Sequence, residues 1–158
     1  MVLTLKLEIA PMLSMIAEVK TRIASAMIGS KKSSIDSTSM VATELLENAI
    51  KYGVVNNHIP QVGLDFELAD DIVSIKVKNG VEESESLEKL KKTMKKICES
   101  ENKKALYLDR LQEIIDNPSK HASHLGLYRI VSKGEFDLKF HIQGDVLEIT
   151  ATKKIREK

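Results

Sequence analysis

Hydrophobic and polar residues alternate in five separate segments of this chain. In the first segment, residues 2–9, leucines occupy every second position from Leu3 to Leu7 and polar residues stand between them. A period of two is typical of a strand with one buried face. Short turn sequences, Ala69-Asp70-Asp71 and Gly144-Asp145, join the other four segments into two hairpins. These four segments are residues 61–68, 72–77, 136–142 and 146–152.

Between the strands, apolar residues recur three or four positions apart, which predicts amphipathic helices. The first helix follows Pro11 and stops near Gly29, and the second begins at a cap between Ser34 and Ser39 and ends at Gly53. The charged stretch 82–117 contains two helices separated near Ser100, and a short helix covers residues 125–131.

The resulting order is β-α-α-β-β-α-α-α-β-β. Helices grouped between hairpins predict an α+β two-layer sandwich, a mostly antiparallel mixed sheet covered by helices on one face. A doubly wound parallel sheet would need strand and helix to alternate strictly. With 158 residues, the chain is expected to form one domain over residues 1–158.

Composition narrows the function classes. The net charge is +1, and the lysine runs are balanced by nearby glutamates, so we expect no nucleic-acid partner. No apolar run approaches the ~18 residues of a membrane span, and the first residues do not resemble a signal peptide. We therefore expect no membrane association and a cytoplasmic location. The single cysteine, Cys98, has no partner for an intramolecular disulfide.

The most informative motif is Glu44-Leu-Leu-Glu-Asn-Ala-Ile-Lys-Tyr-Gly53, on the second predicted helix. Glu44 and Asn48 are four residues apart, so their side chains lie on one face of the helix. An amide oxygen can bind Mg²⁺, and a carboxylate can deprotonate or orient a nucleophile. An ordinary amphipathic helix with solvated Glu and Asn gives the same pattern, so spacing alone leaves both interpretations open.

This motif resembles the N-box of the histidine-kinase-like ATPases, the superfamily of gyrase, histidine kinases and anti-sigma serine kinases. The order of elements is also similar to that of the compact anti-sigma members over nearly the whole chain. The resemblance implies that fold, with Glu44 as general base and Asn48 as the Mg²⁺ ligand. It further implies an ATP site that includes Asn48, Lys51, Gly80 and Gly126.

Two glycine motifs of that family are degraded in this sequence. Where the family has Asp-x-Gly-x-Gly, this chain has Lys78-Asn-Gly-Val-Glu82, so lysine stands where the adenine-reading carboxylate is expected and only Gly80 remains. Asn79-Gly80 also suits a simple turn. Where the family has Gly-x-Gly-Leu-Gly-Leu, this chain has Ala122-Ser-His-Leu-Gly-Leu127, which keeps only Gly126 and the leucines. ATP and Mg²⁺ are therefore expected to bind weakly or not at all.

Two functions remain. The first is a bacterial signalling regulator resembling anti-sigma factors, which binds a sigma factor, an anti-sigma-antagonist-like domain or a phosphatase; its charged segment 82–117 would be the partner surface. The second is an active Mg²⁺-ATP-dependent serine/threonine kinase of the anti-sigma type. A homodimer is also left open. His121 and His124 are spaced to share a metal but lack a third ligand nearby, so surface histidines are expected.

Overall fold

The computed structural model describes residues 2–10, 12–118 and 125–155, and these form an α+β structure around one open sheet. The sheet has five strands in the order β1-β2-β3-β5-β4, and all four neighbouring pairs are antiparallel. The strands are β1 Val2–Ile9, β2 Val62–Ala69, β3 Ile72–Gly80, β4 Asp137–Gln143 and β5 Val146–Lys154. The expected antiparallel hairpins are confirmed, but the expectation of a mixed sheet is wrong.

Alternation along the strands gives the sheet one apolar and one polar face. One row across the sheet consists of Leu5, Phe66, Ile75, Ala151 and Leu138, and all but Leu5 are buried. The neighbouring row, on the opposite face, consists of Lys6, Asp65, Lys76, Thr150 and Lys139. Because successive side chains of a strand point to opposite faces, only the first face needs a covering layer.

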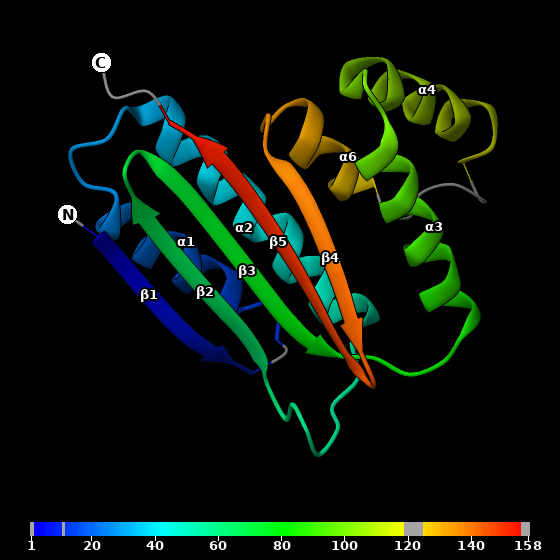
Figure 1. Cartoon of the computed structure of the whole chain (residues 1–158), viewed down its shortest axis with the longest axis horizontal. Coiled ribbons are helices and arrows are strands. Elements are labelled where there is room, and N and C mark those ends of the chain that lie inside the picture. The colour runs from blue at the N-terminus through cyan, green and yellow to red at the C-terminus, as the bar shows by residue number, and fades with distance from the viewer. Residues whose placement is uncertain (1, 11, 119–124, 156–158) are drawn as a thin grey trace.

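Five helices lie among the described residues, in the predicted order. Figure 1 shows α1, α2 and α6 behind one face of the sheet, and α3 and α4 beside the edge formed by β4. The helices are α1 Met15–Ala26, α2 Lys32–Tyr52, α3 Glu85–Glu99, α4 Lys103–Asp116 and α6 Leu125–Ser132. No helix in the described part of the chain is both long and apolar enough to cross a membrane.

The start of α2 differs from the sequence-based expectation. A cap between Ser34 and Ser39 is wrong, since the helix begins at Lys32 and no side chain caps it. In its first turn, Lys32 Nζ lies 2.8 Å from Asp36 Oδ2. This i,i+4 pair and the long buried stripe of the helix favour the extra turn over the local preference of serine for a cap.

The charged stretch forms the two expected helices, and each begins at a side-chain cap. Ser84 Oγ accepts a hydrogen bond from Leu87 N at 3.1 Å, and Asn102 Oδ1 accepts one from Ala105 N at 3.0 Å. The capping residue of α4 explains the break near Ser100, because a new cap ends the preceding helix locally. The two helices pack against β4 and α6 and extend the structure past the sheet edge.

Thr38 provides a test of how this core is packed. Its side chain is fully buried in α2, and Oγ1 has no hydrogen-bond partner among the described residues. An unpaired buried hydroxyl costs about 1–3 kcal/mol, so Thr38→Val, which keeps the shape, is expected to raise the free energy of unfolding by about 1 kcal/mol. Urea denaturation measures the change.

The matched control is Thr43→Val on the same helix, where Oγ1 donates a hydrogen bond to Ser39 O at 2.9 Å. No comparable gain is expected there, because the substitution removes a satisfied hydroxyl. Destabilisation by Thr38→Val would contradict the packing described here.

Candidate functional site

Glu44 lies in the middle of α2 and faces α6. Its side chain is 14% exposed, and Oε1 lies 3.2 Å from Nη1 of Arg129. The carboxylate also covers Gly126 so closely that a Cβ at Gly126 would overlap Glu44 Oε2. The sequence-predicted residues Glu44 and Gly126 are therefore brought together, but by direct contact that leaves no room between them.

Arg129 was not predicted as a site residue, and it organises this contact between helices. It hydrogen-bonds to Tyr107 of α4 as well as pairing with Glu44, and these interactions raise its pKa above the usual arginine value. The carboxylate of Glu44 thus faces a permanent cation on a partly buried surface. We call Glu44, Gly126, Arg129 and Tyr107 the α2–α6 junction. Its only signal in the sequence is that Arg129 follows Gly126 by three residues, on the same helix.

Asn48 lies one turn after Glu44, as predicted. Its Nδ2 is buried and has no hydrogen-bond partner among the described residues. Lys51, the third predicted residue of this helix, is exposed, and its Nζ lies 5.2 Å from the ring centroid of its neighbour Tyr52. Lys51 is therefore part of the solvated end of α2.

Gly80 is buried at the end of β3 rather than placed in a turn, so the simple-turn interpretation of Asn79-Gly80 is wrong. Val54, just after α2, donates a backbone hydrogen bond to Gly80 O at 2.8 Å and forms an isolated bridge with it. A Cβ on Gly80 would overlap Val54 O and lie 2.6 Å from Asn56 Nδ2. A close approach of two backbone segments accounts for this glycine.

The residue beside Gly80 that faces the helices is Asn79, not Lys78. Asn79 is 5% exposed, and its Nδ2 donates a hydrogen bond to Gly80 O at 3.0 Å. Lys78 points to the open face of the sheet, where its Nζ lies 3.4 Å from Glu148 Oε2. Strand alternation therefore places Lys78, the residue that the resemblance aligns with the adenine-reading carboxylate, on the open face, and Asn79 on the face toward the helices.

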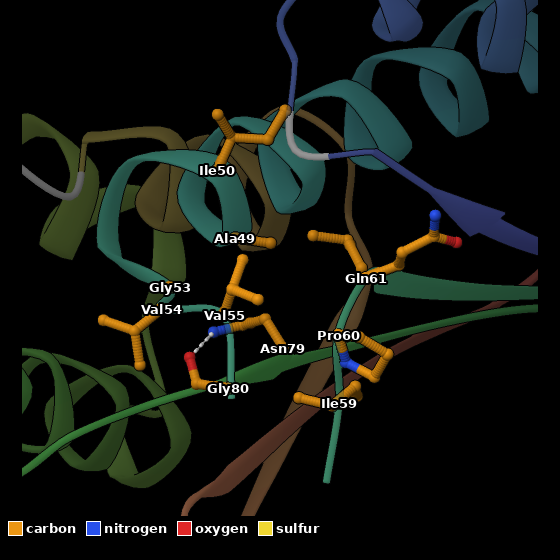
Figure 2. Close-up of a pocket in the computed structure, with 11 residues that line it drawn as sticks. Ala49, Ile50, Gly53, Val54, Val55, Ile59, Pro60, Gln61, Asn79 and Gly80 are labelled. Carbon is orange, nitrogen blue, oxygen red and sulfur yellow. Dashed lines mark hydrogen bonds between the residues drawn. The ribbon is translucent and has the colours of Figure 1, made fainter. Parts of the chain in front are cut away.

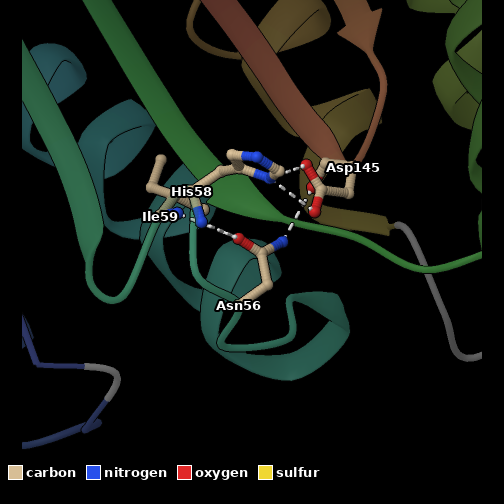
Figure 3. Close-up of polar contacts among 4 residues, drawn as sticks. All are labelled: Asn56, His58, Ile59 and Asp145. Carbon is tan, nitrogen blue, oxygen red and sulfur yellow. Dashed lines mark hydrogen bonds and ion pairs between the residues drawn. The ribbon is translucent and has the colours of Figure 1, made fainter.

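A polar corner holds the loop after α2 in place (Figure 3). Asn56 Nδ2 donates to the backbone oxygen of Asp145 at 3.1 Å, and His58 Nδ1 lies 3.0 Å from both carboxylate oxygens of Asp145. The same backbone oxygen also accepts from Val81 N at 2.8 Å. Three segments, the loop after α2, the end of β3 and the turn between β4 and β5, are joined at Asp145.

A small cavity of about 170 Å³ lies between the end of α2 and the start of β2. Figure 2 shows Ala49, Gly53, Pro60, Asn79 and Gly80 around it. Ligand pockets usually measure about 300–1,000 Å³, so this cavity is small for a nucleotide. Neither Glu44 nor Asn48 lines it, so the structure separates the predicted site residues into two places.

No group of three acidic, histidine or cysteine side chains gathers around Glu44 and Asn48 in the part of the chain that the structure describes. Magnesium requires several oxygen ligands in octahedral geometry. Among the described residues no three His, Cys, Asp or Glu side chains form a group that could hold a metal ion, and Glu44 is engaged by Arg129. Ala122, His121 and His124 lie outside the described residues.

No protein-family model matches the chain, and no curated protein matches it either.

Gly80 allows the structural role of a predicted site residue to be tested. Gly80→Ala forces a methyl group against the backbone of Val54, and we expect it to lower the free energy of unfolding by about 2–3 kcal/mol. Gly63→Ala in β2 is the matched control, because the nearest atom to its Cβ would be 3.8 Å away. Thermal and urea denaturation of both variants measure the difference. Equal, small effects at the two positions would mean that Gly80 is not held by this backbone contact.

Proposed function

We propose that this protein is a bacterial signalling regulator that acts by binding a protein partner through α4, without using a nucleotide. The observation that carries the proposal is an exposed apolar stripe on α4. Leu108 and Ile115 are 63% and 69% exposed and lie seven residues apart, so they point in the same direction. Large exposed hydrophobic side chains gathered on one helix face are typical of interaction sites.

The opposite side of α4 is fixed to the rest of the molecule. Leu106 and Tyr107 are buried, and Arg110 lies 5.7 Å from the ring centroid of Tyr128 on α6. Lys133 Nζ lies 5.5 Å from the ring centroid of Tyr107. The stripe is therefore presented by a helix that is already ordered, which lowers the entropic cost of binding.

The character of this surface favours a partner helix with apolar anchors. A helix face with anchors at i and i+7 suits packing against another helix or into an apolar groove. The neighbouring α3 carries five lysines and three glutamates and thus adds a basic flank. A partner segment with apolar anchors and acidic neighbours fits both features, and a sigma factor, an anti-sigma-antagonist-like domain or a phosphatase is the class of partner that the resemblance suggests.

The geometry favours binding over the alternative, a Mg²⁺-ATP-dependent serine/threonine kinase. A general base needs a free carboxylate within hydrogen-bond reach of the nucleophile. Glu44 is paired with Arg129 and packed on Gly126. Phosphoryl transfer also depends on positioning and neutralising the phosphates. Among the described residues no three His, Cys, Asp or Glu side chains gather to hold a metal, and the hollow that Glu44 lines is bordered by a second carboxylate, Asp36.

A capture experiment with affinity-tagged full-length protein tests the proposal. The double variant Leu108→Asp, Ile115→Asp places two carboxylates in the apolar stripe, and burying them against a partner would cost their hydration free energy. We expect this variant to capture at least about 90% less of a specifically bound partner, which corresponds to a tenfold or greater weakening of binding. Quantitative mass spectrometry compares the captured proteins with those of the unsubstituted chain. Both positions are exposed, so the fold should melt at an unchanged temperature.

Ile28→Asp is the matched control, because Ile28 is an equally apolar residue that is 83% exposed. It belongs to the segment between α1 and α2, which lies far from α4 in Figure 1. This variant is expected to keep the partner. Loss of the same protein from both variants, or its retention by the α4 variant, would contradict a partner site on α4.

A further inference from the structure

The two edge strands of the sheet, β4 and β1, differ in whether another element lies beside them. Beyond β4 lies α3, and Cys98 Sγ of α3 donates a hydrogen bond to the backbone oxygen of Leu138 at 3.2 Å. Beyond β1 no described element lies alongside, and β1 pairs only with β2. The backbone groups on the outer side of an eight-residue strand are therefore open. Such an edge is a template for pairing with another strand unless the protein blocks it.

The side chains of β1 are also only partly covered by the rest of the chain. Leu3, Leu5 and Leu7 face the helix layer but remain only partly buried. On the open face, Lys6 and Glu8 are exposed, and neither has an ion-pair partner in the part of the chain that the structure describes. The edge thus offers unpaired backbone, apolar surface and two charges of opposite sign, of which Lys6 stands opposite Asp65 in the β1–β2 ladder and Glu8 stands opposite Gly63.

We propose that a second copy of this chain pairs with β1 in antiparallel fashion, with a two-fold axis at Leu7, to form a continuous ten-stranded sheet. In this register Leu7 lies opposite Leu7 of the second copy, and Lys6 lies opposite Glu8 on each side of the axis. Two cross-strand ion pairs form, one on each side of the axis, and they give Glu8 a cross-strand cation that it lacks within one chain, where it stands opposite Gly63. The proposal does not depend on the function proposed for α4.

Geometry restricts the registers that compete with this one. A two-fold axis perpendicular to the sheet keeps the helix layers of both copies on the same side of the sheet. Residues that pair across the axis must then point to the same face, so odd-numbered residues pair with odd-numbered ones and even with even. One residue of β1 therefore lies on the axis, opposite its own copy. An axis at Lys6 or at Glu8 places like charges directly opposite, which is unfavourable. An axis at Leu5 sets Lys6 against Thr4 and leaves Glu8 opposite Val2. Only the axis at Leu7 pairs both charges.

The same register gathers exposed apolar side chains at both ends of the shared ladder. Val2 begins β1 and is 62% exposed, and Met12 and Leu13 follow the strand and are 58% and 66% exposed. Antiparallel pairing about Leu7 brings the start of one strand toward the end of the other. Val2 of each copy therefore approaches the Met12–Leu13 segment of the other copy, which adds apolar burial to the backbone hydrogen bonds. The symmetric arrangement is closed, so it stops at two copies.

Sedimentation equilibrium of the full chain tests the pairing through its charges. The unsubstituted protein is expected to dimerise, and Lys6→Glu or Glu8→Lys alone should raise the dimer dissociation constant about tenfold or more, because each creates two like-charge pairs. The double variant with both changes should restore dimerisation. Lys139→Glu is the control on the covered edge strand β4, and it should leave the dimer intact.

Cysteine cross-linking tests the register independently, in a chain that also carries Cys98→Ser. Leu7→Cys is expected to form a disulfide-linked dimer under mild oxidation, whereas Leu5→Cys, opposite Ile9 of the other copy, should not. A chain that stays monomeric up to ~100 μM, a concentration that reveals most specific contacts, overturns the proposal. A dimer that ignores the charge reversals, or that cross-links through Leu5→Cys rather than Leu7→Cys, overturns the register.

Discussion

The close approach between the backbone after α2 and the end of β3 constrains the rest of this structure. Val54 binds the backbone oxygen of Gly80, and Gly53 lies so close to Asn79 that a Cβ there would stand 2.9 Å from Nδ2 of that side chain. The contact ties the C-terminal end of α2 to the end of β3. Since Glu44 lies more than two turns earlier on the same helix, this anchoring also directs its carboxylate toward α6.

The α2–α6 junction follows from that orientation of Glu44. A carboxylate with 14% of its side chain exposed needs a partner, and Arg129 supplies one while also bonding to Tyr107. The pair links α2 to α6, and Tyr107 links α6 to α4. These contacts hold α4, which carries the exposed Leu108 and Ile115, against the rest of the molecule.

Much of the fold was predictable because its local signals agree. Alternation in β1 and in both hairpins and the break between α3 and α4 are visible in the sequence, whereas the caps at Ser84 and Asn102 were found only in the structure. The start of α2 was missed because burial and an ion pair outweigh a serine cap. The role of Gly80 was missed because its partner, Val54, is distant in the sequence, and no local pattern reports a contact between backbones.

The candidate site was less predictable than the fold for a related reason. Glu44, Asn48 and Gly126 were identified as a set, but what decides their chemistry is the guanidinium of Arg129 and the direction of neighbouring side chains. Lys78 and Asn79 show this most clearly. A shift of one residue along a strand exchanges the open face for the helix-facing side, so an alignment uncertain by one position cannot say which side chain meets a ligand.

We propose that α2, with Glu44 paired to Arg129, supports packing and partner binding rather than nucleotide chemistry. The most direct measurement is a calorimetric titration of the full chain with ATP and Mg²⁺, repeated with Asn48→Ala as the matched variant. We expect no binding tighter than ~100 μM in either protein. A low-micromolar dissociation constant that Asn48→Ala weakens would contradict it, because the closed junction would then have to open around a nucleotide and its metal.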